Sequence, residues 1–450
     1  MDLAEVRRNL ETVEAGLDDT ACIDLIRGLE DLKNAAAAAQ ARASLALDTA
    51  RRAERSARGV VKEALSRGVG HEIALARHES PHRGGRHLGF ARVVVNEMPR
   101  TLALMTAGRL SEWRATLLVR ETACLNASDR QKIDTELCAD AATLDGLGDR
   151  AVAAKARALA AKYDAASVVR RAAKAASERH VSVRPAPDSM AYLSALLPLK
   201  EAVACYARQR ADAATIVGCG DPLGRTRSQV MADLLVERVT GRTQAEGHPI
   251  QVHLVVSDQV LFGDGTDPAW VPGFGDVPAD IARQWVRDTA TKDAETAETG
   301  DTAATVVPLR PEPDLVSLRR VYADPESGTL TAMDSKSRKF PPSLARFIDI
   351  RDRTCRTPWC DAPIRHHDHI EPHADGGRTT AHNGSGLCEA CNYAKEGDGF
   401  TATPDATAAT PGDAHTFTIR TPTGHEYRSV APQLPKPAPR TAAVRQAAAG

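Results

Sequence analysis

Hydrophobic residues recur at helical spacing along most of the first 286 positions. Leu3, Val6, Leu10 and Val13 fit one face of a helix, with polar residues between them. The same periodicity predicts a mainly α-helical N-terminal domain. We expect long helices over residues 19–67 and 149–179, a shorter one over 130–138, and several over 87–125 that break near Pro99 and near residues 108–111.

Polar and proline signals interrupt this helical pattern. Asn126 has the side chain of a helix N-cap and precedes the segment 130–138. Pro185 ends the helical block, because proline removes a backbone donor. Helical spacing resumes over residues 188–240 with a break near 218–224. Residues 250–256 instead alternate between apolar and polar, which is typical of a strand.

The pattern changes after residue 286. An acidic stretch without apolar periodicity predicts a disordered linker. Beyond it, short alternating runs favour one hairpin over residues 321–333 and another formed by 416–420 and 426–430, with a helix over 344–353. The domains that we predict are residues 1–286 (helical), 287–310 (linker), 311–402 (a small module), 403–430 (a β extension) and 431–450 (a disordered tail).

Composition narrows the class of protein. Hydrophobic residues make up 42% of the chain but aromatic residues only 4%, so the core must consist mainly of Ala, Leu and Val. The formal net charge is −1, which excludes a global field that attracts nucleic acid. The N-terminus is acidic rather than signal-like, and no apolar run reaches membrane-spanning length. We therefore expect a soluble cytoplasmic protein with no membrane partner.

The nine cysteines fall into two groups. Five are scattered through apolar helical patterns and fit small buried residues of a reducing compartment. The other four form two pairs: four residues separate Cys355 from Cys360, and two separate Cys388 from Cys391. Pairs with this spacing form knuckles whose thiolates converge on one tetrahedral ion, usually a structural Zn²⁺. Disulfides or free thiols are the alternative.

A second pattern lies within this four-cysteine frame. Asp368-His369 is followed fourteen positions later by Asn383, then by Asn392, with Lys395 three positions further on. This order resembles the HNH endonuclease family over roughly residues 351–396. The resemblance implies a zinc-stapled ββα-metal fold, with a loop-rich hairpin and one helix around a divalent ion.

The resemblance also implies roles for these side chains. His369 would be the general base, since histidine exchanges protons near neutral pH. Asp368 and Asn392 would hold a catalytic Mg²⁺ or Mn²⁺, and Asn383 would orient the loop and the base. The family usually has His where this chain has Asn392. An amide oxygen suits magnesium, so nickel- or zinc-based catalysis is less expected.

Several neighbouring residues are candidates for contacts with phosphate. For the arginines, surface salt bridges are an equally good interpretation, and for the histidine a surface or hydrogen-bonding role is favoured. Acidic residues slightly outnumber basic ones between residues 344 and 400. Basic surfaces elsewhere in the protein must therefore contribute to the binding of a polyanion. The candidates are Arg351, Arg353, Arg356, His373 and Lys395.

Most of residues 40–285 also resembles a domain of unknown function that precedes HNH modules in many actinobacterial proteins. Segments that carry this likeness are residues 72–77, 110–116, 121–125, 183–188 and 231–241. The likeness brings no assigned activity. Two basic clusters in this domain, within residues 51–62 and 155–174, are candidates for backbone contacts with nucleic acid, although a solvated helix face or a salt-bridge network between helices is the favoured explanation.

Together these observations predict a metal-dependent HNH endonuclease that hydrolyses DNA. The resemblance to the HNH family implies products with a 5′-phosphate and a 3′-hydroxyl. One alternative is a non-cleaving, nucleic-acid-binding regulator with a structural HNH frame; another is an RNA-directed nuclease. The target sequence, the pathway and the oligomeric state stay open. A homodimer is one solution for double-strand cleavage, because a lone HNH head normally cuts one strand.

Overall fold

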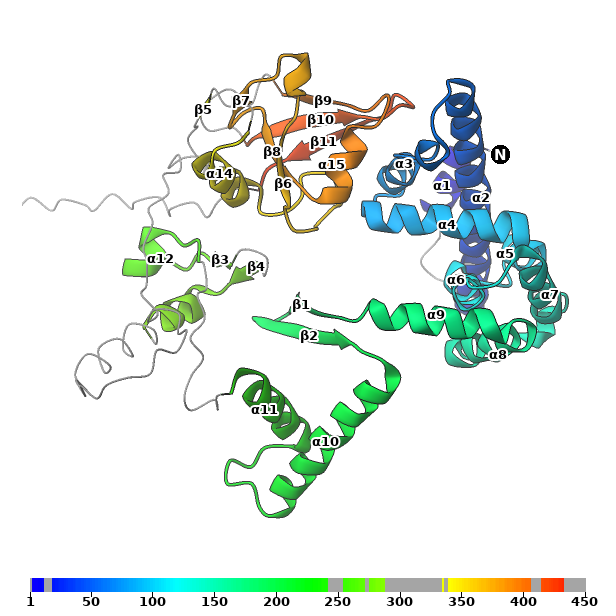
Figure 1. Cartoon of the computed structure of the whole chain (residues 1–450), viewed down its shortest axis with the longest axis horizontal. Helices are drawn as coiled ribbons and strands as arrows, with labels where there is room; N and C mark the ends of the chain where they lie inside the picture. The colour runs from blue at the N-terminus through cyan, green and yellow to red at the C-terminus, as the bar shows by residue number, and fades with distance from the viewer. Residues whose placement is uncertain are drawn as a thin grey trace, which may run out of the picture. The chain divides into compact units, whose positions relative to one another are not determined.

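The computed structural model describes residues 2–11, 18–241, 254–271, 275–287, 334–335, 339–405 and 414–432 (Figure 1). It confirms that the chain is mainly helical. The chain divides into two compact units, Met1–Lys174 and Ala175–Gly450. None of the described helices is long and apolar enough to cross a membrane. The predicted domain boundary at residue 286 stays a prediction.

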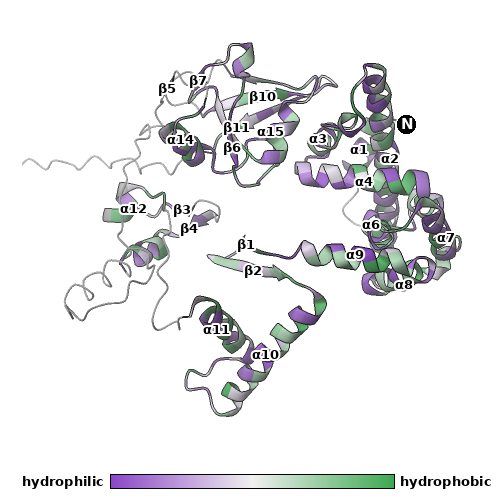
Figure 2. Ribbon diagram, in the orientation of Figure 1, coloured by the Kyte–Doolittle hydropathy of each residue, from purple (hydrophilic) through white to green (hydrophobic). Residues whose placement is uncertain are grey.

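Helices make up the first unit, and hydrophobic and hydrophilic residues alternate around them (Figure 2). They are α1 (Leu3–Glu11), α2 (Asp19–Ala57), α3 (Val69–Ala76), α4 (Pro81–Glu97), α5 (Pro99–Thr106), α6 (Glu112–Glu121), α7 (Ala127–Cys138), α8 (Asp149–Tyr163) and α9 (Ala165–Ser177), with short 3-10 turns at Lys62–Ala64 and Ala141–Thr143.

The core of this unit consists largely of small and aliphatic side chains, as the composition predicts. Ala38, Ala91 and Val94 are fully buried within one cluster that α2 and α4 to α8 share. Small residues also let α3 and α4 approach closely: a Cβ at Gly84 would lie 2.0 Å from the carbonyl oxygen of Gly70. Few bulky side chains are therefore needed to fill the space between these helices.

Two helix predictions in this unit were too long. The helix expected over residues 19–67 ends at Ala57, and Gly59 follows with a φ of 76°. The helix expected over 149–179 is broken at Asp164, whose carboxylate accepts a hydrogen bond from the Ser167 amide at the start of α9. The cap prediction is confirmed, because Asn126 accepts a hydrogen bond from the Asp129 amide.

The second unit begins with a β-hairpin that the helical prediction for residues 188–240 missed. Strands β1 (His180–Ala186) and β2 (Met190–Leu196) pair along their full length. Helices α10 (Leu199–Gly218) and α11 (Arg227–Thr240) follow, and the predicted break near 218–224 separates them. The hairpin was missed because nearly every residue in it is exposed, so burial imposes no period-two pattern on the sequence.

The next described segment is small. It holds α12 (Asp258–Phe262), the antiparallel pair β3 (Ala269–Val271) and β4 (Gly275–Val277), and a helical turn over residues 279–287. Most of the strand predicted over 250–256 lies outside the described residues, although Val255 forms a bridge to Trp270. The first predicted hairpin, over residues 321–333, lies wholly outside the described residues, and nearly all of the predicted linker and tail lies outside them as well.

Residues 339–432 form the part of the chain called the head below. The predicted helix over 344–353 is present as α14, and the predicted hairpin of 416–420 and 426–430 is confirmed with those bounds. The elements of the head are α14 (Pro342–Asp352), β6 (His366–His369), a 3-10 turn (His373–Asp375), β7 (Thr379–Thr380), β8 (Gly384–Leu387), α15 (Glu389–Lys395), β9 (Thr401–Pro404), β10 (Thr416–Arg420) and β11 (Glu426–Val430).

Strands β6 and β8 are antiparallel and lie between α14 and α15 (Figure 1). Strand β8 can lie close to α14 because it carries glycine: a Cβ at Gly384 would come within 2.7 Å of the Ile348 side chain. Strands β9, β10 and β11 form a separate sheet in the order β11-β10-β9. Strand β7 pairs with the two-residue strand β5 (Asp334–Ser335).

Candidate metal centre and catalytic site

The four paired cysteines meet at one point in the head. Their sulfur atoms all lie within 4.8 Å of one another. The Sγ of Cys360 lies 3.6 Å from that of Cys391 and 3.8 Å from that of Cys388. Four thiolates at about 2.3 Å around a tetrahedral Zn²⁺ would be separated by about 3.8 Å. The cluster therefore fits a structural zinc ion with all four positions filled by sulfur.

Local structure brings these sulfurs together. The first pair is closed by a hydrogen bond from the Cys360 amide to the carbonyl of Thr357, with Trp359 in a left-handed conformation between them. In the second pair, Cys388 caps α15 and its sulfur accepts the amide of Cys391 at 3.4 Å. Hydrogen bonds among the four thiols, those with Cys355 first, lower the pKa of Cys388 and raise the pKa values of Cys360 and Cys391.

Alternate side chains of strand β6 contact two different helices. His366 and Asp368 contact α15: the Asn392 amide donates to His366 Nδ1 at 3.0 Å, and Lys395 Nζ lies 2.9 Å from Asp368 Oδ2. The alternate residue His367 instead contacts α14, through Asp349 at 2.7 Å. The period of two along a strand places Asp368 on the α15 side.

His369, at the end of β6, is buried, with 5% of its surface exposed. Its Nε2 lies 2.8 Å from the hydroxyl oxygen of Thr379, and its Nδ1 lies 3.8 Å from Asp368 Oδ1. The rings of Phe340 and His373 pack against the imidazole, with centroids at 4.8 and 5.4 Å. The ring is therefore fixed in place, and Thr379 is a partner that sequence patterns had not indicated.

Asn383 fastens the loop between β6 and β7. Its Oδ1 accepts the Glu371 amide at 2.9 Å, and its Nδ2 donates to the carbonyls of Glu371 and Arg378, each at 3.0 Å. A side chain that makes three such bonds holds both ends of the loop. This geometry is that of a brace, the role that the resemblance implies for Asn383.

Asn392 leaves one polar atom unsatisfied. Its Nδ2 donates to His366, but its Oδ1 is buried and has no hydrogen-bond partner among the described residues. A buried acceptor without a partner costs about 1–3 kcal/mol, so such an atom requires an explanation. An amide oxygen and the nearby carboxylate of Asp368 are hard donors of the kind that Mg²⁺ prefers.

The candidates for phosphate contacts do not share one surface. Arg351 and Arg356 are buried, at 5% and 4% exposure, so the structure does not present them at the surface for contact with a phosphate. Arg353 lies over the Trp270 ring and pairs with Asp276 at 3.6 Å. Lys395 is held by Asp368, by Glu396 and by the carbonyl of His369. His373 lies next to the His369 ring.

The two buried arginines form an ion network around Asp352. Arg351 binds both carboxylate oxygens of Asp352, at 2.7 and 2.9 Å, and Arg356 binds Oδ1 at 2.8 Å. Burial alone would raise the pKa of Asp352, but the charge and hydrogen bonds of Arg351, aided by Arg356, lower it to about 2. Asp352 also accepts the Gly386 amide, and therefore ties α14 to β8.

His415 extends this network to the C-terminal sheet. Its Nδ1 accepts from Arg356 at 3.0 Å, and its Nε2 donates to the His382 carbonyl at 2.8 Å. Burial, together with the charges of Arg351 and Arg356, lowers the pKa of His415 to about 3. The ring is therefore neutral at physiological pH. Sequence patterns did not indicate this role, because 59 residues separate His415 from Arg356.

The lowered pKa of His415 predicts a pH dependence of stability. Between its ordinary pKa of 6.5 and about 3, the unfolded chain binds a proton that the folded head excludes. Stability therefore falls as the pH falls through this range, by about 1.4 kcal/mol per pH unit. The variant His415→Gln retains one donor and one acceptor. Between pH 7 and pH 5, we expect its free energy of unfolding to fall by about 2 kcal/mol less than that of the wild type.

Urea unfolding of both proteins at the two pH values measures this difference. Both proteins keep the four cysteines, so the pH dependence of zinc binding cancels in the comparison. An identical pH dependence in the two proteins would show that His415 is not held neutral in the folded head.

The basic clusters of the first unit differ in accessibility. In the cluster of residues 51–62, Arg55 is buried and donates to backbone carbonyls, and the Arg51 side chain pairs with Glu72 at 11% exposure. These two arginines therefore stabilise the fold rather than face a polyanion. In the other cluster, Arg157 and Lys162 stay exposed but pair with Glu121 and Glu136.

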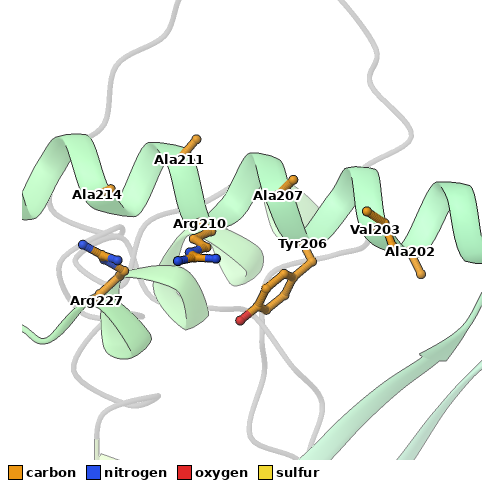
Figure 3. A pocket seen from close by; sticks show the side chains of 8 residues that line it. All are labelled: Ala202, Val203, Tyr206, Ala207, Arg210, Ala211, Ala214 and Arg227. Carbon is orange, nitrogen blue, oxygen red and sulfur yellow. The ribbon is translucent and has the colours of Figure 1, made fainter.

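An open groove lies elsewhere, along α10. Alanines of α10 line it, and Tyr206 and Arg210 project from α10 on the side where Arg227 of α11 lies (Figure 3). It contains no group of side chains suited to hold a metal, and we do not assign chemistry to it.

Comparison of the chain with protein-family models, with curated proteins and with solved structures finds no match. The description of the four-cysteine centre and of strand β6 therefore depends on the sequence and structure of this chain, and not on a relative.

Proposed function

We propose that the head is the catalytic module of a metal-dependent endonuclease of the HNH type, which hydrolyses phosphodiester bonds of DNA. The observation that carries the proposal is the buried Oδ1 of Asn392, which lacks a hydrogen-bond partner among the described residues. It belongs to the helix that contacts the Asp368 side of β6. If this oxygen is a ligand of a cation, its lack of a hydrogen-bond partner is explained. The fit of the four cysteines to zinc supports a frame stabilised by a metal.

His369 is the general base in this proposal. In this proposal Nε2–H donates to the Thr379 hydroxyl oxygen, 2.8 Å away, which leaves the lone pair of the ring on Nδ1, the nitrogen nearer to Asp368. Thr379 and the flanking rings of Phe340 and His373 hold the imidazole in this orientation. Nδ1 then accepts the proton of the attacking water.

Asp368 and Asn392 hold the divalent cation through a carboxylate and an amide oxygen. Bound there, Mg²⁺ would stabilise the negative charge that develops on the phosphate and the leaving oxygen. In its absence the ammonium of Lys395 compensates the charge of Asp368, at 2.9 Å. Asn383 keeps the loop that follows His369 in place, so that the base and the cation ligands hold a constant separation.

The experiment that tests this function is cleavage of supercoiled plasmid in the presence of Mg²⁺. We expect the wild type to nick or linearise the plasmid, and His369→Ala to lower the rate by about 10²–10⁴-fold because a general base is lost. His367→Ala is the matched control: His367 lies next to Asp368 on the same strand, but its ring contacts Asp349 of α14. This control should retain activity.

Zinc content must be equal in the three proteins, so that loss of activity is not loss of the fold. If wild type and His369→Ala were both inert on DNA and on RNA with Mg²⁺ and with Mn²⁺, the nuclease proposal would fail, and a non-cleaving regulator would be the better explanation. Cleavage of RNA alone would transfer the proposal to an RNA-directed nuclease. Equal cleavage by both proteins would show that His369 is not the base.

A further inference from the structure

The ammonium of Lys395, at the end of α15, is surrounded by three oxygen atoms. Its Nζ lies 2.9 Å from Asp368 Oδ2 and 3.0 Å from Glu396 Oε1, and it donates to the carbonyl oxygen of His369 at 2.6 Å. An ammonium has three N–H donors, so these three oxygens can engage all of them. The Lys395 side chain is 11% exposed. It is therefore a charge held inside the head at β6, and not a free surface lysine.

These contacts leave Lys395 without a donor for any further acceptor. The sequence indicated this lysine as a candidate phosphate contact, and a lysine binds phosphate through the same N–H groups. Lys395 can therefore contact a phosphate only after it gives up at least one of its three oxygens.

Asp368 supplies the strongest of the three contacts. The carbonyl of His369 carries no formal charge. The carboxylate of Glu396 is 54% exposed, and an ion pair in that position is weakened by solvent. The carboxylate of Asp368 is 27% exposed, so its attraction for the ammonium is screened less. The position of Lys395 thus depends mainly on Asp368.

The proposed function assigns this same carboxylate to a divalent cation. The carboxylate carries a single negative charge, and Lys395 already compensates it at 2.9 Å. A divalent cation bound to Asp368 would lie close to the ammonium, and like charges at short range repel strongly where water is partly excluded. The ammonium and the cation therefore compete for Asp368.

We propose that Lys395 and the divalent cation exchange at Asp368. On binding of the cation, Lys395 leaves this carboxylate, and its ammonium becomes available to a phosphate of the substrate. Lys395 lies three positions after Asn392 on α15, so the released side chain stays beside the cation ligands. This inference rests on the proposed function, from which it takes those ligands. It couples the two binding events, because the head offers this charge to a phosphate only when the cation is bound.

The test measures cation affinity without catalysis. Mn²⁺ is titrated into the zinc-loaded full chain, and the free ion is followed by electron paramagnetic resonance. Lys395→Met removes the ammonium and retains a long side chain, so we expect it to bind Mn²⁺ about tenfold more tightly than the wild type. Arg346→Met is the matched control. It removes one positive charge from an exposed residue of α14 and should leave the affinity for Mn²⁺ unchanged.

A second measurement follows the release of Lys395 directly. Acetylation by an N-hydroxysuccinimide ester, quantified by peptide mass spectrometry, should be slow at Lys395 and about fivefold or more faster at saturating Mn²⁺. Lys33 of the helical unit is 70% exposed and serves as the internal reference, whose rate should not change. In Asp368→Asn, Lys395 should react rapidly with or without Mn²⁺, because its main partner has lost its charge.

Zinc content and circular dichroism should not differ among these proteins. Equal Mn²⁺ affinity in the wild type and Lys395→Met would overturn the inference, and so would acetylation of Lys395 that Mn²⁺ leaves unchanged or slows. Asp368→Asn separates this failure from that of the proposed function. If it bound Mn²⁺ as tightly as the wild type, the proposed cation site itself would be wrong. If Mn²⁺ binding required Asp368 but was not tightened in Lys395→Met, only the exchange would fail.

Discussion

Replacement of Cys360 by serine is expected to remove zinc from the protein and to unfold the head. Cys360 is buried, and its sulfur lies within 3.8 Å of two other cysteine sulfurs. Among the described residues of the head, the hydrophobic clusters away from the cysteines are small: one lies around Ile348 and one around Phe417. A structural zinc site of this kind contributes on the order of 10–16 kcal/mol of apparent binding free energy, so its loss exceeds what these clusters can compensate.

Two measurements check this expectation. The wild type should contain one zinc per chain by atomic emission, and Cys360→Ser should contain almost none. Limited proteolysis should then cut the variant within residues 339–432 while it leaves the helical unit intact. Cys205→Ser is the matched control, because Cys205 is an exposed cysteine of α10. Wild-type protein that lacks zinc, yet resists protease equally before and after treatment with a chelator, would refute the metal centre.

Asp352→Asn is expected to destabilise the head by about 3–5 kcal/mol, because it leaves two buried arginines without their counter-charge. The Asp352 side chain is 0% exposed, and those of Arg351 and Arg356 are 6% and 3% exposed. The contribution of the carboxylate has a definite pH range. It is present above the ordinary pKa of 3.8 and is lost as the pH falls through about 2, the lowered pKa in the folded head.

Urea unfolding at pH 7 with saturating zinc measures this effect. Asp349→Asn is the control: this residue lies one turn earlier in α14, its side chain is 50% exposed, and it pairs with His367. An exposed pair of this kind contributes at most about 1 kcal/mol. If the two variants lost equal stability, the buried network would not be the element that joins α14, β8 and the C-terminal sheet.

Local sequence patterns determined the features that depend on nearby residues. The cap at Asn126 was predictable because its hydrogen bond joins residues three positions apart, and the hairpin of β10 and β11 because a short turn connects its two alternating runs. The two cysteine pairs were predictable for the same reason, since a knuckle fixes its own ligand spacing. That both pairs share one centre was inferred from chemistry, and the sulfur positions agree with it.

Only the tertiary structure decided the use of the charged side chains. The sequence left Arg351 and Arg356 open between phosphate contacts and salt bridges, and the structure pairs them inside the head with the carboxylate of Asp352, and Arg356 also with the distant His415. Burial of a charge depends on which groups surround it in space, and local sequence does not specify those groups.

The sequence by itself therefore determined a mainly helical chain, two cysteine pairs with the spacing of metal ligands, and the order of candidate catalytic residues within that frame. The tertiary structure decided that Thr379 orients His369, that Asn392 has an unsatisfied oxygen and that residues 180–196 form an exposed hairpin. The physical reason is range. Helix periodicity, caps and ligand pairs are encoded within a few residues, whereas the partner of a buried polar group is brought to it by the fold of the whole head.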